Sequence, residues 1–434
     1  MYTMISSKTK VFAFCLAVCS MLPALFFSGC SEQDDYPQGL EDISLPVSLQ
    51  RSANDALRIA QSLRRQSSTR LNGPEDETTV APILSTDLYP DSVLLETQMV
   101  DTVLYVVNFN SNGGFYLVSG DLRMTEVLGF SDTGSLDLDE GTADASVPML
   151  RAMLSDYCLS ITEEHPIPEP VPWEPPVTPV FPATPDSVAI WRVYISCSPW
   201  ETVDSVPVLL PVEWNQGHPY NRELGNGQYS TGCVPLAVAQ LLTYFRLPSG
   251  TPNFPFDWDL IVADSYTQSG NWVAYQAEVG ELLRWVCEGL NAQFYADSTI
   301  AYLADVPAFL SQQAGFSHPS SLKSYEWSKV LQSLEAGRPV LVRGNDGLHE
   351  NGHTWVIDGY KLQKCIKTTR DTYWMTTVEE TLWQTLVHCN WGGSNNGYFI
   401  EGIFDRYHYR DTVGDTDQEE YYRYGLTIID NIYP

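Results

Sequence analysis

The fold is decided by the stretch Ser230-Thr231-Gly232-Cys233-Val234-Pro235-Leu236-Ala237-Val238-Ala239-Gln240-Leu241-Leu242-Thr243-Tyr244. A hydroxyl residue and a glycine precede Cys233, a proline follows in the first turn, and apolar residues continue at helical spacing. The pattern predicts a helix that begins at Cys233 behind a hydroxyl cap. Because free amides and the helix dipole favour a thiolate at a helix N-terminus, Cys233 is a candidate nucleophile. A small buried cysteine at the start of a core helix gives the same pattern, so this stretch alone leaves both interpretations open.

A cysteine nucleophile also needs a base, a group that orients the base and a donor for the oxyanion. His353 precedes an apolar run that predicts a buried strand, so it is the candidate base. Downstream, Asn390 is a candidate for holding the imidazole, with Trp391 shielding the pair. Gln216 lies upstream of the cysteine, and its side-chain amide is a candidate oxyanion donor. The groups therefore follow one another in the order Gln, Cys, His and Asn.

Four short motifs carry a family resemblance: Asn215-Gln216-Gly217, Thr231-Gly232-Cys233, Gly352-His353 with Val356-Ile357-Asp358-Gly359, and Asn390-Trp391-Gly392. From about residue 206 onward, the sequence resembles the streptopain-type cysteine peptidases, which have a papain-like fold. The resemblance implies that Cys233 is the nucleophile, His353 the base, Asn390 the orienting group and Gln216 the oxyanion donor. It also implies that Trp391 packs over His353 and Asn390, and it implies no cofactor and no metal.

Two features depart from the family pattern. The family commonly shows Asn-Trp-Gly-Trp-Gly-Gly, whereas here Asn390-Trp391 is followed directly by Gly392-Gly393-Ser394. We therefore expect a shortened loop beside the leaving-group side of the cleft. The separation between His353 and Asn390 is also long, and it accommodates a charged insertion at residues 361–380. We expect this insertion to be a solvent-exposed excursion.

Composition divides the chain into five parts. Residues 1–30 are predicted to be a lipoprotein signal peptide, 31–42 an acidic tether, 43–160 an inhibitory propeptide-like domain, 161–186 a proline-rich linker and 187–434 the peptidase domain. Residues 117–132, with Ser119-Gly120-Asp121 and Leu128-Gly129-Phe130-Ser131-Asp132, resemble the inhibitory propeptide domain found ahead of these enzymes. Nine prolines between residues 166 and 185 favour an extended linker that proteases can reach.

The predicted fold class is α+β, a papain-like peptidase domain preceded by a smaller α+β propeptide domain. Helical spacing predicts helices at residues 52–63, 236–244, 275–287 and 325–336. Strand-like segments occur at residues 103–109, 115–119, 339–343, 354–358 and 398–401, with Asn112-Gly113-Gly114 as a turn between the first two.

The first thirty residues predict export. Lys8 and Lys10 precede an apolar run at residues 11–27 that is too short and wrongly flanked for a spanning helix. The ending Ser28-Gly29-Cys30 resembles a bacterial lipobox, which would make Cys30 the lipidated first residue of the mature protein. With the acidic tether, this pattern predicts an outer-membrane lipoprotein at the cell surface. An ordinary secretory signal with an accidental cysteine is the alternative.

The charge balance excludes one class of partner. The chain has 24 Lys+Arg against 54 Asp+Glu, a net charge of −30, and nucleic-acid recognition depends on basic residues. For the same reason an anionic membrane surface is disfavoured, which leaves the lipid anchor as the expected membrane contact. The expected partners are protein or peptide substrates and the chain's own propeptide.

Six cysteines remain once the signal and Cys30 are set aside: Cys158, Cys197, Cys233, Cys287, Cys365 and Cys389. This number does not make a disulfide scaffold in a chain of this length. No Cys-x-x-Cys pair occurs, so neither a zinc ribbon nor a redox dithiol is indicated. We expect at most one bridge, between Cys365 and Cys389.

A rival motif overlaps the candidate base. The string His349-Glu350-Asn351-Gly352-His353 matches the H-E-x-x-H pattern of zinc peptidases, which requires both histidines on one face of a helix. Here Asn-Gly favours a turn and strand-like residues follow, so the zinc interpretation is disfavoured. We expect His388 to stack or to hydrogen-bond in the core, and we rank Cys389 below Cys233 because no helix begins there.

Together these features predict an exported, lipid-anchored cysteine endopeptidase that is made as a zymogen and uses a Cys-His-Asn site. The main alternative is a non-catalytic surface-binding, adhesin-like protein that retains the peptidase fold. An amidase or acyltransferase with the same Cys and His chemistry is a third possibility that the residues leave open.

Overall fold

The computed structural model of this 434-residue chain describes residues 50–67, 78–84, 101–109, 113–139, 146–164, 193–263, 272–296, 298–317, 321–345, 352–371, 376–404, 408–409, 421–422 and 425–434. The predicted signal peptide, Cys30, the acidic tether and almost all of the predicted linker lie outside the described residues. The predicted domain boundaries therefore stay predictions.

The chain divides into two compact units. The described part of the larger unit lies between residues 50 and 164, 200 and 364, and 383 and 434. The smaller unit includes the described residues 193–199, 365–371 and 376–382. All of the candidate site residues except Cys30 belong to the larger unit.

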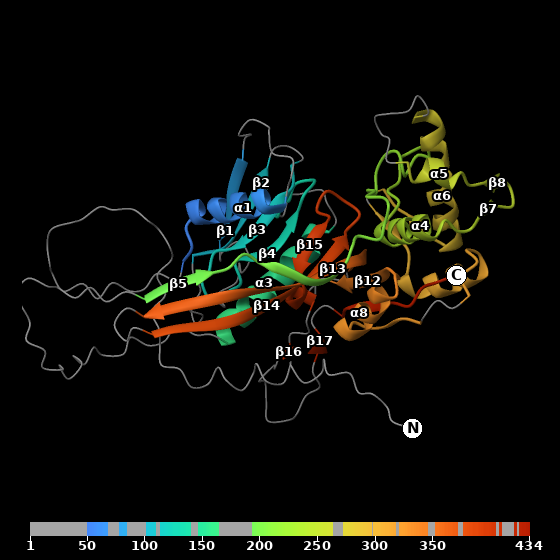
Figure 1. The fold of residues 1–434 in the computed structure, drawn as a ribbon. Helices are drawn as coiled ribbons and strands as arrows, with labels where there is room; N and C mark the ends of the chain where they lie inside the picture. The colour runs from blue at the N-terminus through green and yellow to red at the C-terminus, as the bar shows by residue number, and fades with distance from the viewer. Residues whose placement is uncertain are drawn as a thin grey trace, which may run out of the picture. The chain divides into compact units, whose positions relative to one another are not determined.

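The N-terminal region of the larger unit is a helix packed on an antiparallel sheet (Figure 1). Its elements are α1 (Ala53–Ser67), β1 (Thr78–Leu84), β2 (Thr102–Phe109), β3 (Phe115–Ser119), β4 (Val127–Ser131) and α3 (Val147–Glu164). Ala56 and Ala60 of α1 are fully buried against an apolar sheet face that includes Tyr105 and Val107. The predicted helix and both predicted strands of this region are confirmed, and the helix runs four residues further than its apolar pattern, to Ser67.

The C-terminal region contains five of the described helices and most of the described strands. Its helices are α4 (Cys233–Phe245), α5 (Trp258–Ile261), α6 (Trp272–Gly289), α7 (Val306–Gln312) and α8 (Trp327–Glu335), with 3-10 turns η3 (Leu303–Asp305) and η4 (Glu401–Phe404). Its strands are β5 (Val193–Cys197), β6 (Glu201–Val206), β7 (Gly250–Thr251), β8 (Phe254–Pro255), β9 (Gln293–Phe294), β10 (Thr299–Ile300), β11 (Lys323–Ser324), β12 (Val340–Asn345), β13 (Gly352–Asp371), β14 (Thr376–Asn390), β15 (Gly397–Ile400), β16 (His408–Tyr409), β17 (Tyr421–Tyr422) and β18 (Thr427–Ile429). The predicted helices and strands of this region are all present, with most ends shifted by a few residues. The exception is the strand predicted at residues 354–358, which continues thirteen residues further, to Asp371.

The two regions of the larger unit share one sheet. Its strand order is β1-β2-β3-β4-β15-β14-β13-β12-β18-β11, so β4 of the N-terminal region pairs with β15 of the C-terminal region. The pairing is antiparallel and sets Tyr398 opposite Phe130 and Phe399 opposite Gly129. A Cβ at Gly129 would lie 2.8 Å from the Phe399 ring and from the Tyr398 carbonyl oxygen. The close strand contact therefore explains the glycine.

The described part of the charged insertion, residues 361–371 and 376–380, is regular β structure. β13 continues through Asp371 and β14 begins at Thr376, while β6 and β5 pair with successive parts of β13. The first six residues of β14 are all exposed, in agreement with the predicted solvent-exposed excursion, whereas residues 361–364 on β13 are half-buried and Cys365 is buried. The prediction therefore holds for the β14 half of the insertion.

The predicted Cys365–Cys389 bridge is wrong. All six described cysteines are free of disulfide bonds. Cys389 packs in the apolar core of the larger unit, whereas Cys365 belongs to the smaller unit. Among the helices that the structure describes, none is both long enough and apolar enough to span a membrane.

Candidate active site

Cys233 is the first residue of α4, as its sequence predicts. Residues 234–243 of this helix are all buried, so the helix is fixed in the core while Cys233 is partly exposed at its end. Gly232 is the N-cap with a φ of 78°, and a Cβ there would lie 2.8 Å from the carbonyl oxygen of Thr299. Only glycine fits this backbone comfortably.

The predicted hydroxyl cap is wrong in its detail. No side chain caps α4 with a hydrogen bond among the described residues. The Ser230 hydroxyl instead accepts from the Gly232 amide at 3.2 Å, and the Thr231 hydroxyl donates to the Gly232 carbonyl oxygen at 3.3 Å. The left-handed glycine turns both hydroxyl residues away from the helix, which leaves its first amides without a side-chain cap.

The structure places Cys233 in hydrogen-bond contact with His353. Burial raises the pKa of the Cys233 thiol, but the hydrogen bond and positive charge of His353 lower it more, with help from the Thr354 amide and Arg343. The resulting pKa is about 7, below the ordinary value for cysteine. A large thiolate fraction is therefore present near neutral pH.

His353 lies near the start of β13 with only 3% of its surface exposed. Its Nε2 lies 2.9 Å from the carbonyl oxygen of Trp391, which can only accept, so Nε2–H donates. Nδ1 is then the ring nitrogen that can exchange a proton with the thiol. The ring stacks with Trp391 at a centroid distance of 6.2 Å and with Trp355 at 6.3 Å.

Asn390 ends β14 and is buried beside this pair. Its Nδ2 donates to the Val212 carbonyl oxygen at 3.0 Å, and its Oδ1 accepts from the Gly392 amide at 3.2 Å. These bonds fix the turn that carries Trp391. The predicted role of Asn390 as the direct partner of the imidazole stays a prediction.

Gln216 lies next to the segment that leads into Cys233. Its main-chain oxygen accepts from the Thr231 amide at 3.1 Å, and its Oε1 accepts from the Ser230 hydroxyl at 3.1 Å. Since Oε1 is held by Ser230, the other side-chain group of Gln216 is the donor Nε2. Sequence reasoning missed Ser230 in this role, although its position three residues before Cys233 was the available signal.

Two comparisons with known proteins bear on this site. Residues 214–399 match the Peptidase C10 family, and residues 50–161 match the Spi protease inhibitor family. The chain is a cysteine peptidase with an inhibitor domain. The predicted family is thereby confirmed, and the inhibitor domain precedes the peptidase domain as the sequence indicated.

Curated relatives agree with these matches. Streptopain of Streptococcus pyogenes serotype M28 (strain MGAS6180) is 25% identical over 357 residues, covering 72% of this chain and 77% of that protein. Thiol protease/hemagglutinin PrtT of Porphyromonas gingivalis is 24% identical over 368 residues, covering 76% of this chain and 38% of that protein.

The peptidase domain holds a second cysteine and histidine that face the core. Cys389 has no exposed surface, and burial, with the charge of Asp358, raises its pKa well above the ordinary value. The His388 Nδ1 donates to Asp358 Oδ1 at 2.6 Å, and its ring meets Tyr398 edge-on. The predicted core hydrogen bond of His388 is confirmed. Cys389 is also less exposed than Cys233, and its lower rank as a nucleophile stays a prediction.

The structure describes only the last two residues of the rival zinc motif, Gly352 and His353. His349 and Glu350 lie outside the described residues, and His353 belongs to a strand and not to a helix. In the part of the chain that the structure describes, no cluster of three or more His, Cys, Asp or Glu side chains is arranged to hold a metal. The strand geometry at His353 contradicts the helix that this motif requires.

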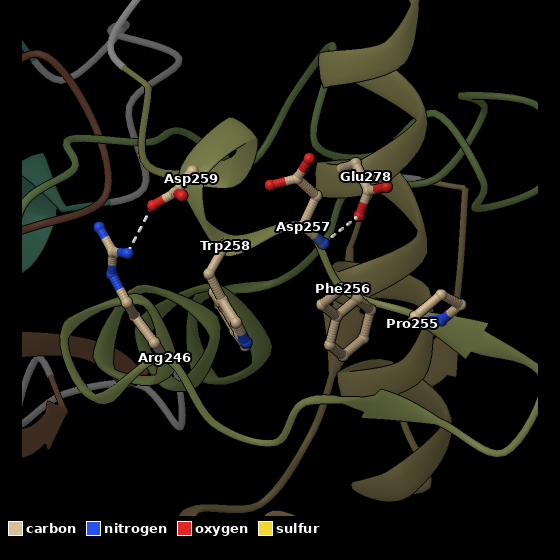
Figure 2. A pocket seen from close by; sticks show the side chains of 7 residues that line it. All are labelled: Arg246, Pro255, Phe256, Asp257, Trp258, Asp259 and Glu278. Carbon is tan, nitrogen blue, oxygen red and sulfur yellow. Dashed lines mark hydrogen bonds and ion pairs between the residues drawn. The ribbon is translucent and has the colours of Figure 1, made fainter.

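An open hollow lies elsewhere in the peptidase domain (Figure 2). It is lined by Arg246, Pro255, Phe256, Asp257, Trp258, Asp259 and Glu278. Arg246 pairs with Asp259 at 2.6 Å, and Glu278 accepts from the Asp257 amide at 3.1 Å. Arg246 is the C-cap of α4, so the hollow lies about 20 Å along the helix from Cys233 and is separate from the candidate active site.

The inhibitor domain contacts the loop that follows Trp391. Ser146 accepts from Asn395 Nδ2 at 3.1 Å, and a Cβ at Gly134 would lie 2.5 Å from the Ser394 carbonyl oxygen. Nearby, the Lys361 ammonium lies 5.0 Å from the ring centre of Phe130 in the inhibitor domain. The inhibitor domain thus reaches the loop beside the candidate active site through the Ser146 hydroxyl and a close backbone approach at Gly134.

Proposed function

We propose that this chain is an exported, lipid-anchored, papain-like cysteine endopeptidase made as a zymogen. The observation that carries the catalytic part is the contact between Cys233 at the start of α4 and His353 on β13, which lowers the thiol pKa to about 7. A thiol that is partly exposed and about half ionised at pH 7 has the properties that a nucleophile needs.

The reaction proceeds in two steps. The Cys233 thiolate attacks the carbonyl carbon of a peptide bond, and His353 gives a proton to the leaving amine, so that a thioester and a free amine form. Water, deprotonated by His353, then attacks the thioester, which releases the acid product and restores the thiol and imidazole pair. Protons and electrons balance without any cofactor.

Gln216 is the proposed oxyanion donor. The Ser230 hydroxyl occupies Oε1, so the amide directs its Nε2–H group elsewhere, and the position next to the Cys233 turn supports a role at the developing oxyanion. Asn390 and Trp391 hold the other side of the imidazole, Asn390 through the turn and Trp391 through its ring and its carbonyl oxygen. A preorganised donor of this kind typically accelerates acyl transfer by about 100-fold or more.

The inhibitor domain is proposed to restrain the peptidase until the linker at residues 161–186 is cut. The shared sheet and the contacts with residues 394 and 395 support this restraint. Cleavage alone would leave these contacts in place, so release of the inhibitor domain is a separate step.

Export and lipidation rest on the sequence pattern that ends at Cys30. The lipid would be attached on the inhibitor side of the linker, so cutting the linker separates the peptidase from its covalent anchor. Processed enzyme is then either shed or held by non-covalent contact with the inhibitor domain. A mature peptidase fragment that still carries lipid would contradict this topology.

Self-processing tests the proposal. Residues 31–434 are expressed with and without Cys233→Ala, and intact mass is followed over time. We expect a fragment of roughly 27 kDa, estimated from ordinary domain lengths, only when Cys233 is present. If neither protein changes, an added protease cuts the linker and the freed peptidase domain is assayed on casein. Casein hydrolysis by the freed domain indicates that another protease activates the enzyme. Absence of casein hydrolysis contradicts the catalytic proposal and favours the non-catalytic binding protein.

A further inference from the structure

A main-chain carbonyl group is one of the groups that orient His353. Nε2 of His353 donates to the Trp391 carbonyl oxygen at 2.9 Å, and this bond selects the tautomer that leaves Nδ1 for the thiol. The position of that carbonyl depends in turn on how the peptide groups on either side of Trp391 are held.

A buried asparagine holds the other end of the same residue. Asn396 Oδ1 accepts from the Trp391 amide at 2.7 Å, and Asn396 is only 4% exposed. The hydrogen bonds therefore form a relay from Asn396 through the Trp391 backbone to His353. By contrast, the two hydrogen bonds that Asn390 makes go to Val212 and Gly392.

Among the residues that the structure describes, the side chain of Asn396 accepts a hydrogen bond through its oxygen but donates none through its amide nitrogen. Within the described part of the chain, its buried Nδ2 has no hydrogen-bond partner. Buried polar groups usually have a hydrogen-bond partner, so burying Nδ2 without one lowers the stability of the fold. Asn396 therefore places an acceptor at the Trp391 amide at the expense of stability.

We propose that Asn396 is a positioning residue, which sets the imidazole of His353 by fixing the Trp391 peptide. The inference rests on the proposed roles of Cys233 and His353. It assigns the task of orienting the base to Asn396 and the Trp391 backbone, and not to the other side chains of the loop at residues 391–396. Asn396 does not touch the reacting atoms, and its effect on the thiol passes through the Trp391 carbonyl and His353.

The test measures the pH dependence of Cys233 alkylation by iodoacetamide in residues 31–434, resolved by residue with mass spectrometry. Exposed Cys197 serves as the internal reference thiol. Asn396→Leu keeps the branched shape without the acceptor, and Asn396→Asp keeps an acceptor. Wild type should show a midpoint near the Cys233 pKa of about 7. In the Leu variant we expect a midpoint about one unit higher, and a fall in kcat on a peptide substrate of about 100-fold with little change in KM.

We expect loss of the Asn396 Oδ1 acceptor to cause the shift in the alkylation midpoint of Cys233. Asn396→Asp keeps the acceptor but adds a buried carboxylate, so its midpoint should move less than that of Asn396→Leu without returning fully to the wild-type value. The matched control is Asn395→Ala, which removes an equally buried neighbour whose amide bonds to Ser146 of the inhibitor domain, and its midpoint should not move. If circular dichroism shows that the Leu variant does not fold, Asn396→Ala removes the acceptor without adding apolar bulk and replaces it.

Two results would overturn the proposal. One is a folded Leu or Ala variant with the wild-type midpoint and kcat, and the other is a shift in Asn390→Leu that no Asn396 variant shows. His353→Ala is measured in the same assay. If it leaves the midpoint unchanged, the proposed site itself fails. If it moves the midpoint and the Asn396 variants do not, only the positioning role fails.

Discussion

The peptidase domain holds two cysteines with a neighbouring histidine, Cys233 in space and Cys389 only along the chain, and their surroundings have opposite effects. Cys233 begins a helix and contacts His353, and its pKa falls to about 7. Cys389 lies on β14 beside His388, whose imidazole is bound to Asp358, and its pKa is raised well above the ordinary value. Burial raises the pKa of both thiols, so the neighbouring charge decides the outcome. The imidazole of His353 lowers the pKa of Cys233, whereas the carboxylate of Asp358 adds to the rise in the pKa of Cys389.

The largest expected difference is in peptide hydrolysis, between the variant that lacks the Cys233 thiol and the variant that lacks the Cys389 thiol. Cys233→Ala should abolish peptide hydrolysis and self-processing, because no other group in the proposed mechanism forms the thioester. Cys389→Ala should keep hydrolysis within a few-fold of wild type and lower the free energy of unfolding by roughly 1–2 kcal/mol. Turnover on a peptide substrate and urea unfolding check both variants. A folded Cys389→Ala protein that does not hydrolyse peptides would contradict the claim that Cys389 has only a structural role.

Removing each imidazole gives the next largest effect. In His353→Ala, burial acts on the Cys233 thiol without its main opposing influence, so its pKa should rise to its ordinary value or above. If the pKa reaches about 9, the thiolate fraction at pH 7 falls about 50-fold. Alkylation of wild-type Cys233 should slow as the pH falls through about 7, because the thiol form then dominates.

The matched control is His388→Gln. Because His388 bonds to Asp358 and faces the core, its loss should leave the pH midpoint of Cys233 alkylation near the wild-type value. Peptide turnover should fall by about 100- to 10,000-fold only in the His353 variant. Equal shifts of the midpoint in the two variants would show that the pairs are not independent.

The local elements of this comparison could be predicted from the sequence. Helical spacing after Cys233 fixed the position of α4, and the apolar run after His353 indicated β13. The order of Gln216, Cys233 and His353 was sufficient to suggest a thiol site. These features are readable because each depends on the periodicity or type of residues close together in the chain.

Contacts between turns could not be predicted in the same way. The bond from Asn396 to the Trp391 amide depends on the backbone path of a short loop, and Ser230 faces Gln216 because Gly232 adopts a positive φ. The pairing of Gly129 with Phe399 joins strands far apart in the sequence. No periodic pattern encodes such long-range registers, and the incorrect Cys365–Cys389 bridge has the same origin.

The smallest catalytic effect is expected at the carboxylate of the second pair. Asp358 has no exposed surface, and its two oxygens accept from the His388 imidazole at 2.6 Å and from the Leu210 amide at 3.0 Å. Asparagine offers only one such oxygen, so Asp358→Asn leaves one of these buried donors facing an NH2 group. We expect the free energy of unfolding to fall by about 1–3 kcal/mol.

Asp430→Asn is the matched control for this loss, because Asp430 pairs with Lys323, which is partly exposed, and an exposed pair contributes less. Both variants are compared by urea unfolding, and peptide turnover is normalised to folded protein. Turnover in Asp358→Asn should stay within a few-fold of wild type, and the alkylation midpoint of Cys233 should not move. A shift of that midpoint as large as the one in His353→Ala would mean that Asp358 acts on the first thiol as well. The second cysteine and histidine would then belong to the active site, since stability alone would not explain the change.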